Sequence, residues 1–360
     1  MSKTPIARTT LMALLLGATA AQAQVTLFGV ADIAVRRVDN EGRGHLNSMV
    51  SGANSTSRLG FRGTEDLGDG LFAGFHLEHG IALDVGSPAN STLFFDRRST
   101  VSLGSRAWGE LRAGRDFVPS YSNWGRYDPF SYVGVAGSNN FVSATPVGPI
   151  RSAFGSGGNT TVRSSNALQY ILPAGLGGLQ GEVMLARREG GLAANGQHDL
   201  RGARLGWANK TVEVSGAITI SSNDLTTATG TDFKDLALGG RANLGPVRAS
   251  LALRRFTLKD ARQTNVLVGA VVPLGQHEIK LSYTQVDLQG KVGTTVINAN
   301  DSRQLGMGYV YLLSKRSAAY GTLSRVQNRG AATYAVPGGP SGLVGGGTST
   351  GLEFGVRHNF

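Results

Sequence analysis

The feature that most constrains this chain is a two-residue alternation of apolar and polar side chains that recurs along most of its length. In 25–35 the odd positions are apolar or small, while the even positions include Thr26 and Asp32. The C-terminal segment repeats the pattern, with Leu352, Phe354, Val356, His358 and Phe360 on one face and Glu353, Gly355, Arg357 and Asn359 on the other. Successive side chains of a strand point to opposite faces. These segments are therefore predicted to be strands with one apolar and one polar face.

Short turns and long loops separate the alternating segments. Seven short turn signals lie at 65–69, 105–107, 173–177, 208–210, 244–246, 273–276 and 314–316. The intervening connections are mostly longer and rich in Gly, Asn, Ser and Thr, notably 117–161, 287–300 and 329–348. Short turns at one end and long loops at the other are typical of a β-barrel in an outer membrane.

The same pattern predicts an all-β chain with sixteen antiparallel strands, at 25–37, 48–64, 70–83, 92–104, 108–115, 162–172, 178–188, 198–207, 211–221, 232–243, 247–258, 262–272, 277–286, 301–313, 317–328 and 349–360. An even number returns both ends of the sheet to the same side, so the sheet can close and leave no edge exposed to lipid. We therefore expect a 16-stranded transmembrane β-barrel. A soluble sandwich or an adhesin-like β domain would also alternate and stays an alternative.

The first 23 residues have the organisation of a secretory signal peptide. Lys3 and Arg8 precede an apolar run at 11–16, and small residues end the segment at Ala21 and Ala23. The run is too short to cross a bilayer, so we expect cleavage after Ala23 and a mature barrel domain at 24–360. Beyond this segment no window approaches 18 consecutive apolar residues, which excludes helical membrane spans.

The chain is strongly basic, with a formal net charge of +11. Removing the two bases Lys3 and Arg8 with the signal would leave +9. The arginines are scattered singly or in pairs rather than clustered in one patch, and together with the export signal this argues against a nucleic-acid partner. Anionic solutes and lipid headgroups are the expected partners. Cysteine is absent, so neither a disulfide framework nor thiolate chemistry is expected.

Four segments resemble the trimeric general porins of Gram-negative bacteria, namely SRLGFRGTEDLGDGLFAGFHLE at 57–78, RRSTVSLGSRAWGELRAGRDFVPSY at 97–121, RSSNALQYILP at 163–173 and GVRHNF at 355–360. The resemblance implies a 16-stranded barrel in the outer membrane, surrounded by lipid and lipopolysaccharide and assembled as a homotrimer. It also implies a third loop, roughly from Asp116 to Arg151, folded into the lumen. The terminal Phe360 is similar to the signal by which the barrel-assembly machinery recognises its clients.

Alternation predicts which charged side chains enter the lumen. Leu59 and Phe61 take the lipid face of their strand, which places Arg58 and Arg62 inside. The same parity places three more charged residues inside: Asp96, Arg98 and Arg112. Charge around the narrowest point of a channel selects the ions that pass, so these side chains are candidates for the pore constriction.

The resemblance adds further candidates for the constriction. Arg115 matches a basic residue that family members carry in a Gly-Arg pair at the start of the third loop, where a bend would turn the side chain inward. Arg58 and Arg163 match other wall arginines of the family, and Arg151 is a further candidate. General porins usually set acidic residues of the third loop against these arginines, whereas 118–150 here contains the single acid Asp128.

A basic wall that faces few carboxylates predicts a positive constriction. We therefore expect a passive general diffusion channel for small hydrophilic solutes that prefers anions, with no cofactor. A substrate-specific channel would instead show a saturable site for one solute. A surface adhesin acting through the long loops would release no solute from liposomes.

Catalysis and metal binding are not expected. The six histidines lie in no recognisable hydrolase motif, and an esterase or protease would need one beside a serine and an orienting partner. The sequence H-L-E-H at 76–79 lacks the H-E-x-x-H order, and alternation would place His76 and His79 on opposite faces.

Overall fold

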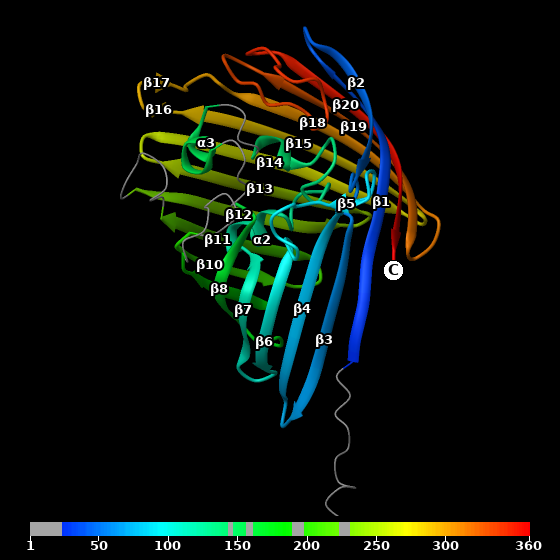
Figure 1. Cartoon of the computed structure of the whole chain (residues 1–360), viewed down its shortest axis with the longest axis vertical. Coiled ribbons are helices and arrows are strands. Elements are labelled where there is room, and N and C mark those ends of the chain that lie inside the picture. Colours follow the sequence, from blue (N-terminus) through cyan, green and yellow to red (C-terminus); the bar gives the residue numbers. More distant parts are fainter. Residues whose placement is uncertain (1–23, 143–146, 156–160, 189–197, 223–230) are drawn as a thin grey trace, which may run out of the picture.

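The computed structural model describes residues 24–142, 147–155, 161–188, 198–222 and 231–360. The expected signal peptide, 1–23, lies outside the described residues. The described strands form a curved wall around a lumen, with the chain running through the wall in sequence order (Figure 1).

Sixteen described strands form the wall, and each pairs antiparallel with the next. In order they are β1 (Gln24–Asn40), β3 (Arg58–Gly68), β4 (Leu71–Ala82), β6 (Arg98–Ser105), β7 (Gly109–Phe117), β8 (Arg163–Ile171), β9 (Leu179–Ala186), β10 (Leu200–Ala208), β11 (Val212–Ser222), β12 (Asp232–Leu244), β13 (Val247–Leu258), β14 (Ala261–Leu274), β15 (His277–Gln289), β18 (Ser302–Leu312), β19 (Ser317–Asn328) and β20 (Thr348–Asn359). β20 pairs with β1 over Val30–Asn40, which closes the ring. The predicted fold class is therefore confirmed.

Shorter elements lie in the connections. β2 (Gly44–Ser51) forms a hairpin with the second half of β1, while β5 (Ser87–Pro88), β16 (Lys291–Val292) and β17 (Thr295–Val296) are two-residue strands. The helical turns α2 (Pro119–Trp124), η1 (Ser138–Phe141) and α3 (Pro149–Phe154) all belong to the connection between β7 and β8. None of the helices in the described part of the chain has the length and apolar character needed to cross a membrane.

Most predicted strand boundaries agree with the structure to within three residues, and 247–258 and 317–328 match β13 and β19, whereas the predicted strand 92–104 starts six residues before β6. The main difference is the predicted strand 48–64, which is broken into β2 and β3. The carboxylate of Asp32 accepts hydrogen bonds from the backbone N–H groups of Asn54 and Ser55, at 3.0 and 2.6 Å. The Asp32 side chain thus binds two backbone N–H groups that a continuous strand would donate to a neighbouring strand, and the chain bends away from the wall there.

The two faces of the wall differ as the alternation predicts. Val35 and Val101 have 56% and 61% of their surface exposed on the outside. The neighbouring Asp32 and Arg36 are buried on the inside, at 0% and 8%. An apolar outer face is favourable only where the surroundings are hydrocarbon, so this exposure fits a wall that stands in lipid.

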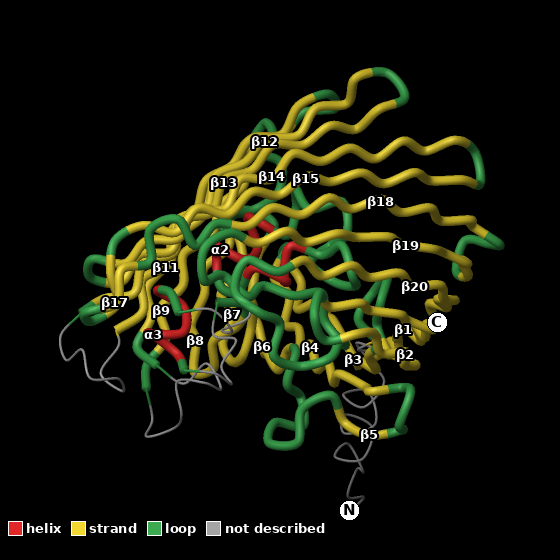
Figure 2. The backbone as a smooth tube through the Cα atoms, turned by 90° about the horizontal axis from the view of Figure 1, so that it is seen from above, coloured by secondary structure: helices red, strands yellow, loops and turns green. Residues whose placement is uncertain are grey.

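The connection between β7 and β8, residues 118–162, is the inward loop. Its helical turns pack against the wall, α2 against β10 to β12 and α3 against β13 and β14, and Figure 2 shows both among these strands. This location confirms the predicted folding of the third loop into the lumen, although the loop extends beyond the expected end at Arg151. One apolar cluster joins Trp124 and Tyr132 of the loop to Phe233 and Phe256 on the inner wall.

Glycines on the inner wall form the surface on which the inward loop packs, and we call this surface the seat. A Cβ added to Gly239 would lie 2.3 Å from the ring of Tyr127, and one added to Gly269 would lie 2.5 Å from Pro129. Further pairs continue along the loop: Gly202 with Pro119, Gly308 with Phe130, Gly306 with Ala136, and Gly351 with Val135. The loop can therefore approach the wall more closely than any other residue type would allow.

Two buried ion pairs anchor the inward loop to the wall. Arg254 binds both carboxylate oxygens of Asp235, at 3.0 and 2.7 Å, and donates to the carbonyl of Thr161 at 2.8 Å. The same carboxylate accepts a hydrogen bond from the Ser120 hydroxyl at 2.7 Å, so the start and the end of the loop meet at one pair. A second pair, Arg36 with Glu353, lies near the tip of the loop at 2.7 Å.

Candidate functional site

The wall opposite the seat carries a group of inward-facing arginines. β3, β4, β6, β7 and β8 form this arginine wall, and Arg58, Arg98 and Arg163 are the first residues of β3, β6 and β8. These strand ends connect to the long loops, so we call this side of the barrel the long-loop end and the opposite side the short-turn end. The arginines therefore lie beside the origin of the inward loop, where the lumen is narrowed.

Arg58 is partly exposed and only loosely paired. Its side chain is 26% exposed, and its Nε lies 3.7 Å from Oε2 of Glu78. One terminal nitrogen donates to the Thr56 carbonyl at 3.0 Å. Glu78 binds Arg97 more closely, with Arg97 Nε 2.5 Å from Oε1. One carboxylate is thus shared by two guanidinium groups, which leaves a positive surplus at this point of the wall.

Arg163 extends the same positive surface. Its Nε donates to the carbonyl of Arg97 at 2.8 Å, and its guanidinium lies over the ring of Phe117, 4.5 Å from the centroid. Its charge also interacts with the positive charges of Arg97 and Arg115 and with the negative charge of Asp96. The aromatic ring supports the guanidinium without neutralising it, because a cation–π contact adds no negative charge.

Arg115 is placed by an irregularity in β7. The register with β8 shifts between Gly114 and Asp116, and Gly114 has φ +127°, a conformation open to glycine. Arg115 then donates to the Asp96 carbonyl at 2.6 Å and to the Ser165 hydroxyl at 2.8 Å. β7 therefore bends at the start of the inward loop.

Arg98 and Arg112 share one carboxylate. Asp116 Oδ2 lies 3.2 Å from Arg98 and 2.9 Å from Arg112. Arg112 also pairs with Glu110 at 2.9 Å, and Arg98 lies 3.3 Å from Nδ1 of His76. Compared with Arg58, these two arginines are closely neutralised, so they add less to the field in the lumen.

The remaining candidate residues lie apart from this group. Arg62 is exposed, farther along β3 toward the short-turn end, with its guanidinium 5.1 Å from the ring of Phe28. Arg151 is exposed on α3 of the inward loop. The carboxylate of Asp128 is turned into the loop, where it accepts hydrogen bonds from Phe130 N–H, Tyr132 N–H and both the N–H and the hydroxyl of Ser138. Asp128 therefore shapes the loop rather than facing the arginines.

Three further bases of the lumen were not among the sequence candidates. Arg97 precedes the first residue of β6, where alternation no longer predicts its direction. Arg357 and Lys280 follow the inward parity of β20 and β15, and Arg357 donates to the Asn54 amide oxygen at 2.7 Å. The charge of Arg357 interacts with those of Arg58 and Lys280. The alternation of inward and outward positions, applied to β15 and β20, would have predicted Lys280 and Arg357 as inward bases.

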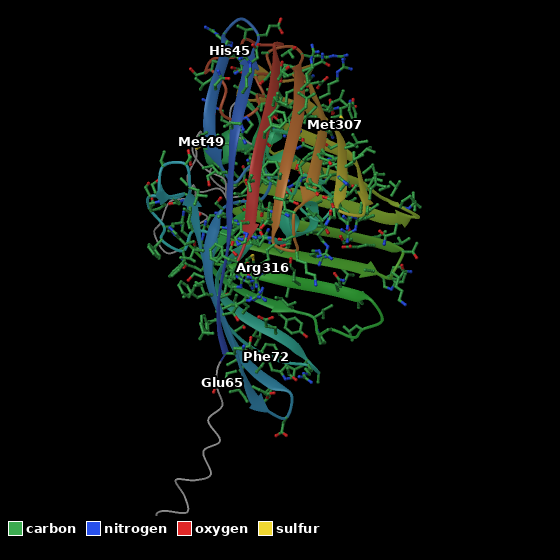
Figure 3. All side chains as sticks on the ribbon, turned by 90° about the vertical axis from the view of Figure 1, so that its right-hand side faces the viewer. His45, Met49, Glu65, Phe72, Met307 and Arg316 are labelled. Atoms are coloured by element: carbon green, nitrogen blue, oxygen red, sulfur yellow. The ribbon has the colours of Figure 1, made fainter. Side chains whose placement is uncertain are left out.

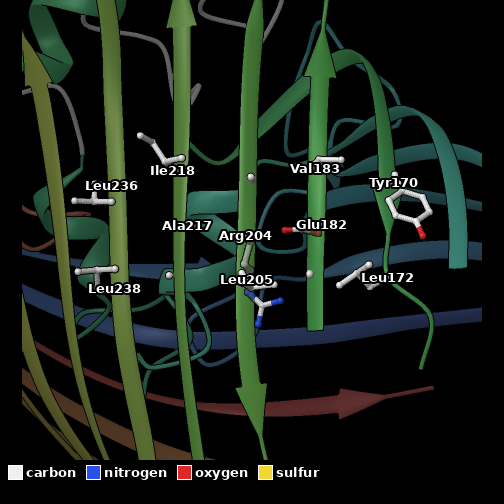
Figure 4. Close-up of a pocket in the computed structure, with 13 residues that line it drawn as sticks. Tyr170, Leu172, Glu182, Val183, Arg204, Leu205, Ala217, Ile218, Leu236 and Leu238 are labelled. Atoms are coloured by element: carbon white, nitrogen blue, oxygen red, sulfur yellow. The ribbon is translucent and has the colours of Figure 1, made fainter. Parts of the chain in front are cut away.

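The most apolar pockets lie outside the barrel. One of about 540 Å³ runs over β8 to β12, lined by Val183, Leu205, Ile218 and Leu238 (Figure 4). The glycines of this surface leave shallow hollows between larger side chains. Such hollows face hydrocarbon, so they are not candidates for a hydrophilic solute.

Metal binding finds no support at the H-L-E-H segment. His76 lies in the lumen at the edge of the Phe28 ring, 5.3 Å between centroids, whereas His79 stacks on Phe94 at 4.6 Å. Across the residues that the structure describes, no group of three or more His, Cys, Asp or Glu side chains is arranged to hold a metal ion.

Comparisons with known proteins identify relatives that share this fold. The chain is 35% identical over 375 residues to outer membrane porin protein 32 of Delftia acidovorans, covering 96% of both chains. It is 35% identical over 188 residues to an outer membrane porin protein of Bordetella pertussis, covering 48% of this chain and 45% of that one. Its fold is similar to a solved anion-selective porin from Comamonas acidovorans, with a TM-score of 0.77, 32% identity and coverage of 94% and 100%.

A family model described as Gram-negative porin matches residues 9–331, which is most of the sequence. The match spans the arginine wall and the inward loop, the two features that shape the lumen. With a relative of 35% identity over nearly the whole length, it shows that this chain belongs to the Gram-negative porin family, whose members form channels in the outer membrane.

Proposed function

We propose that this porin is a general diffusion channel with a preference for small anions, and that the arginine wall produces the preference. The observation that carries the proposal is the surplus of guanidinium groups beside the loop: Arg58 and Arg97 share the carboxylate of Glu78, and Arg163 forms no ion pair with another residue that the structure describes. The relative from Comamonas acidovorans, named as anion-selective, supports it.

The proposed mechanism is diffusion down a concentration gradient. Low-dielectric walls concentrate the field of the arginines in the lumen, which raises the local concentration of anions and lowers that of cations. Arg58, Arg115 and Arg163 would contribute most, and Arg98 less because Asp116 neutralises it. Arg62 and Arg151 would act at the two approaches, and Asp128 would hold the shape of the loop. No cofactor is required.

The reversal potential across a potassium chloride gradient tests the proposal in a planar bilayer. We expect chloride to be preferred in the wild type, and the double variant Arg58→Gln, Arg163→Gln to lose about two- to tenfold in the chloride-to-potassium permeability ratio, equivalent to about 0.4–1.4 kcal/mol. The matched control is Arg325→Gln, because Arg325 is exposed on β19 beside the outward-facing Leu323. Preference for potassium in the wild type would overturn the proposal.

We also propose that the precursor is cleaved after Ala23, that three copies assemble in a membrane with lipopolysaccharide, and that Phe360 is read by the barrel-assembly machinery. Phe360 is 44% exposed, and its backbone N–H and carbonyl pair with Gly29, so the ring is available at the end of β20. Mass spectrometry of the purified protein should give Gln24 as the first residue. Deletion of Phe360 should reduce the folded, membrane-inserted fraction, whereas an unchanged fraction would contradict its proposed role.

A further inference from the structure

A polar cavity lies on the other side of the lumen from the arginine wall. Its volume is about 330 Å³, and it is enclosed by residues 125–131 of the inward loop and by β12 to β15. Arg248 stands just after the β12–β13 turn, and Glu278 and Lys280 just after the β14–β15 turn. We call it the short-turn cavity, because a solute that has passed the arginine wall meets it on the way to the short-turn end.

The charges of the short-turn cavity are unevenly matched. Arg126 and Arg241 share the single carboxylate of Glu213, the latter at 2.5 Å. Lys280 Nζ lies 3.4 Å from Oε1 of Glu278. Arg248 forms no ion pair with any other residue that the structure describes. The loop carboxylate at the edge of the cavity, Asp128, accepts four hydrogen bonds within the loop, and its negative charge also acts on Lys280.

The bases also differ in their surroundings in a way that suits a small divalent anion. The side chain of Lys280 is only 12% exposed, so its charge is poorly screened by water. Arg248 is exposed and offers a planar guanidinium that can bind two oxygens of one ligand. Val271 pairs with both Arg248 and Lys280 and so separates the two bases on the wall, while the nearby Ser250 hydroxyl already donates to the Tyr127 carbonyl at 2.7 Å. An oxyanion would therefore be recognised by charge and by guanidinium geometry.

We propose that the short-turn cavity is a second anion-binding subsite, which holds a small dianion such as phosphate or a short dicarboxylate between Arg248 and Lys280. The inference rests on the proposed anion pathway and adds to it a saturable step near the short-turn end. Chloride, with one charge and no oxygen atoms, gains little from this geometry. The subsite thus slows dianions relative to chloride without closing the channel.

The experiment is a titration of the chloride current with inorganic phosphate in a planar bilayer, at mildly alkaline pH and constant ionic strength. We expect phosphate to reduce the wild-type current with a saturable dependence on concentration. The double variant Arg248→Gln, Lys280→Gln should raise the half-blocking concentration by about fivefold or more, because two charge contacts are removed. The matched control, Lys210→Gln, removes an exposed base from the β10–β11 turn outside the cavity and should leave the block unchanged.

The outcomes separate this subsite from the proposed anion preference. A phosphate block that is absent in the wild type, or equal in the wild type and the double variant, overturns the subsite. A wild-type reversal potential that favours potassium overturns the anion preference instead, whatever the phosphate titration gives. If the double variant does not fold, Arg248→Gln alone provides the test. Arg248 has no ion-pair partner in the described structure, so its substitution leaves no carboxylate without a partner.

Discussion

The two sides of the lumen use arginine in different ways. On the seat of the inward loop, Arg254 has no exposed side-chain surface and binds both oxygens of Asp235. On the arginine wall, Arg58 is 26% exposed and its nearest carboxylate oxygen is 3.7 Å away. A buried guanidinium whose charge is matched by a carboxylate is out of reach of a passing solute, whereas a partly exposed and loosely paired one can still donate to it. The comparison indicates that an inward arginine can select passing anions only where its own ion-pair and hydrogen-bond partners leave its charge partly unneutralised.

The largest expected effect is the loss of the buried anchor. Arg254→Ala would leave the Asp235 carboxylate buried without its partner, which costs about 3–5 kcal/mol in the free energy of unfolding. The fluorescence of Trp124, which is 1% exposed in the same apolar cluster, should report the unfolding transition in urea. Arg255→Ala, one position along the strand, is the control. A destabilisation no larger than that of the control would contradict the assignment of Arg254 as an anchor.

Asp128 should have the next largest effect, because its four hydrogen bonds hold the turn of the inward loop. Asp128→Ala leaves three backbone N–H groups without their acceptor and should cost about 2–4 kcal/mol. The loop should then be cut by protease in the folded barrel, and the single-channel current should become noisier. Asp128→Asn retains one acceptor oxygen and should give an intermediate result. Equal protease resistance of all three proteins would show that the hydrogen bonds do not hold the loop.

A smaller effect is expected from filling the seat behind the loop. Gly239→Ala places a Cβ 2.3 Å from the Tyr127 ring, so the loop must shift toward the arginine wall, at a cost of about 1–3 kcal/mol. The single-channel conductance should fall while the reversal potential changes little. Gly240→Ala is the matched control, because its added Cβ has no heavy atom closer than 3.5 Å. Unchanged conductance in Gly239→Ala would mean that the loop does not set the width of the lumen.

The smallest effect, below about 1 kcal/mol, is the response to salt, and it separates the two kinds of arginine directly. Raising the ionic strength from about 0.1 to 1 M shortens the Debye length from about 10 to 3 Å. The preference for chloride should weaken, because Arg58 and Arg163 are reached by solvent. The destabilisation caused by Arg254→Ala should stay the same, because that pair is screened much less. If salt reduced the chloride preference and the destabilisation by Arg254→Ala to the same extent, the arginines on the two sides of the lumen would not differ in their screening.

Much of the wall was predictable, because alternation is a local property of each strand. It predicted sixteen strands and the inward direction of Arg58 and Arg98, and the resemblance predicted the inward loop. It also led to a channel rather than an enzyme, which membership of the porin family confirms.

The contacts of the inward loop were not predictable by the same reasoning. They join positions far apart in the sequence, such as Ser120 with Asp235, and no periodicity relates the two. The direction of the Asp128 carboxylate was missed for the same reason, since an acid in a loop carries no parity. Arg97 was missed because the predicted strand 92–104 starts six residues before β6, and the alternation of that strand turns Arg97 outward. A signal for the seat was present, however, in the glycines that recur on the inward face of β10, β12, β14, β18 and β20.

Seen from the side, the barrel presents long strands and exposed side chains such as Met307 (Figure 3). The glycine seat has a consequence for how such a channel can diversify. The size limit for solutes depends on how deeply the loop sinks into the wall, and the charge preference depends on the wall across from it. A methyl group gained or lost behind the loop would therefore change the size limit for solutes and leave the charge preference unchanged. Selectivity for size and selectivity for charge can thus evolve on separate residues.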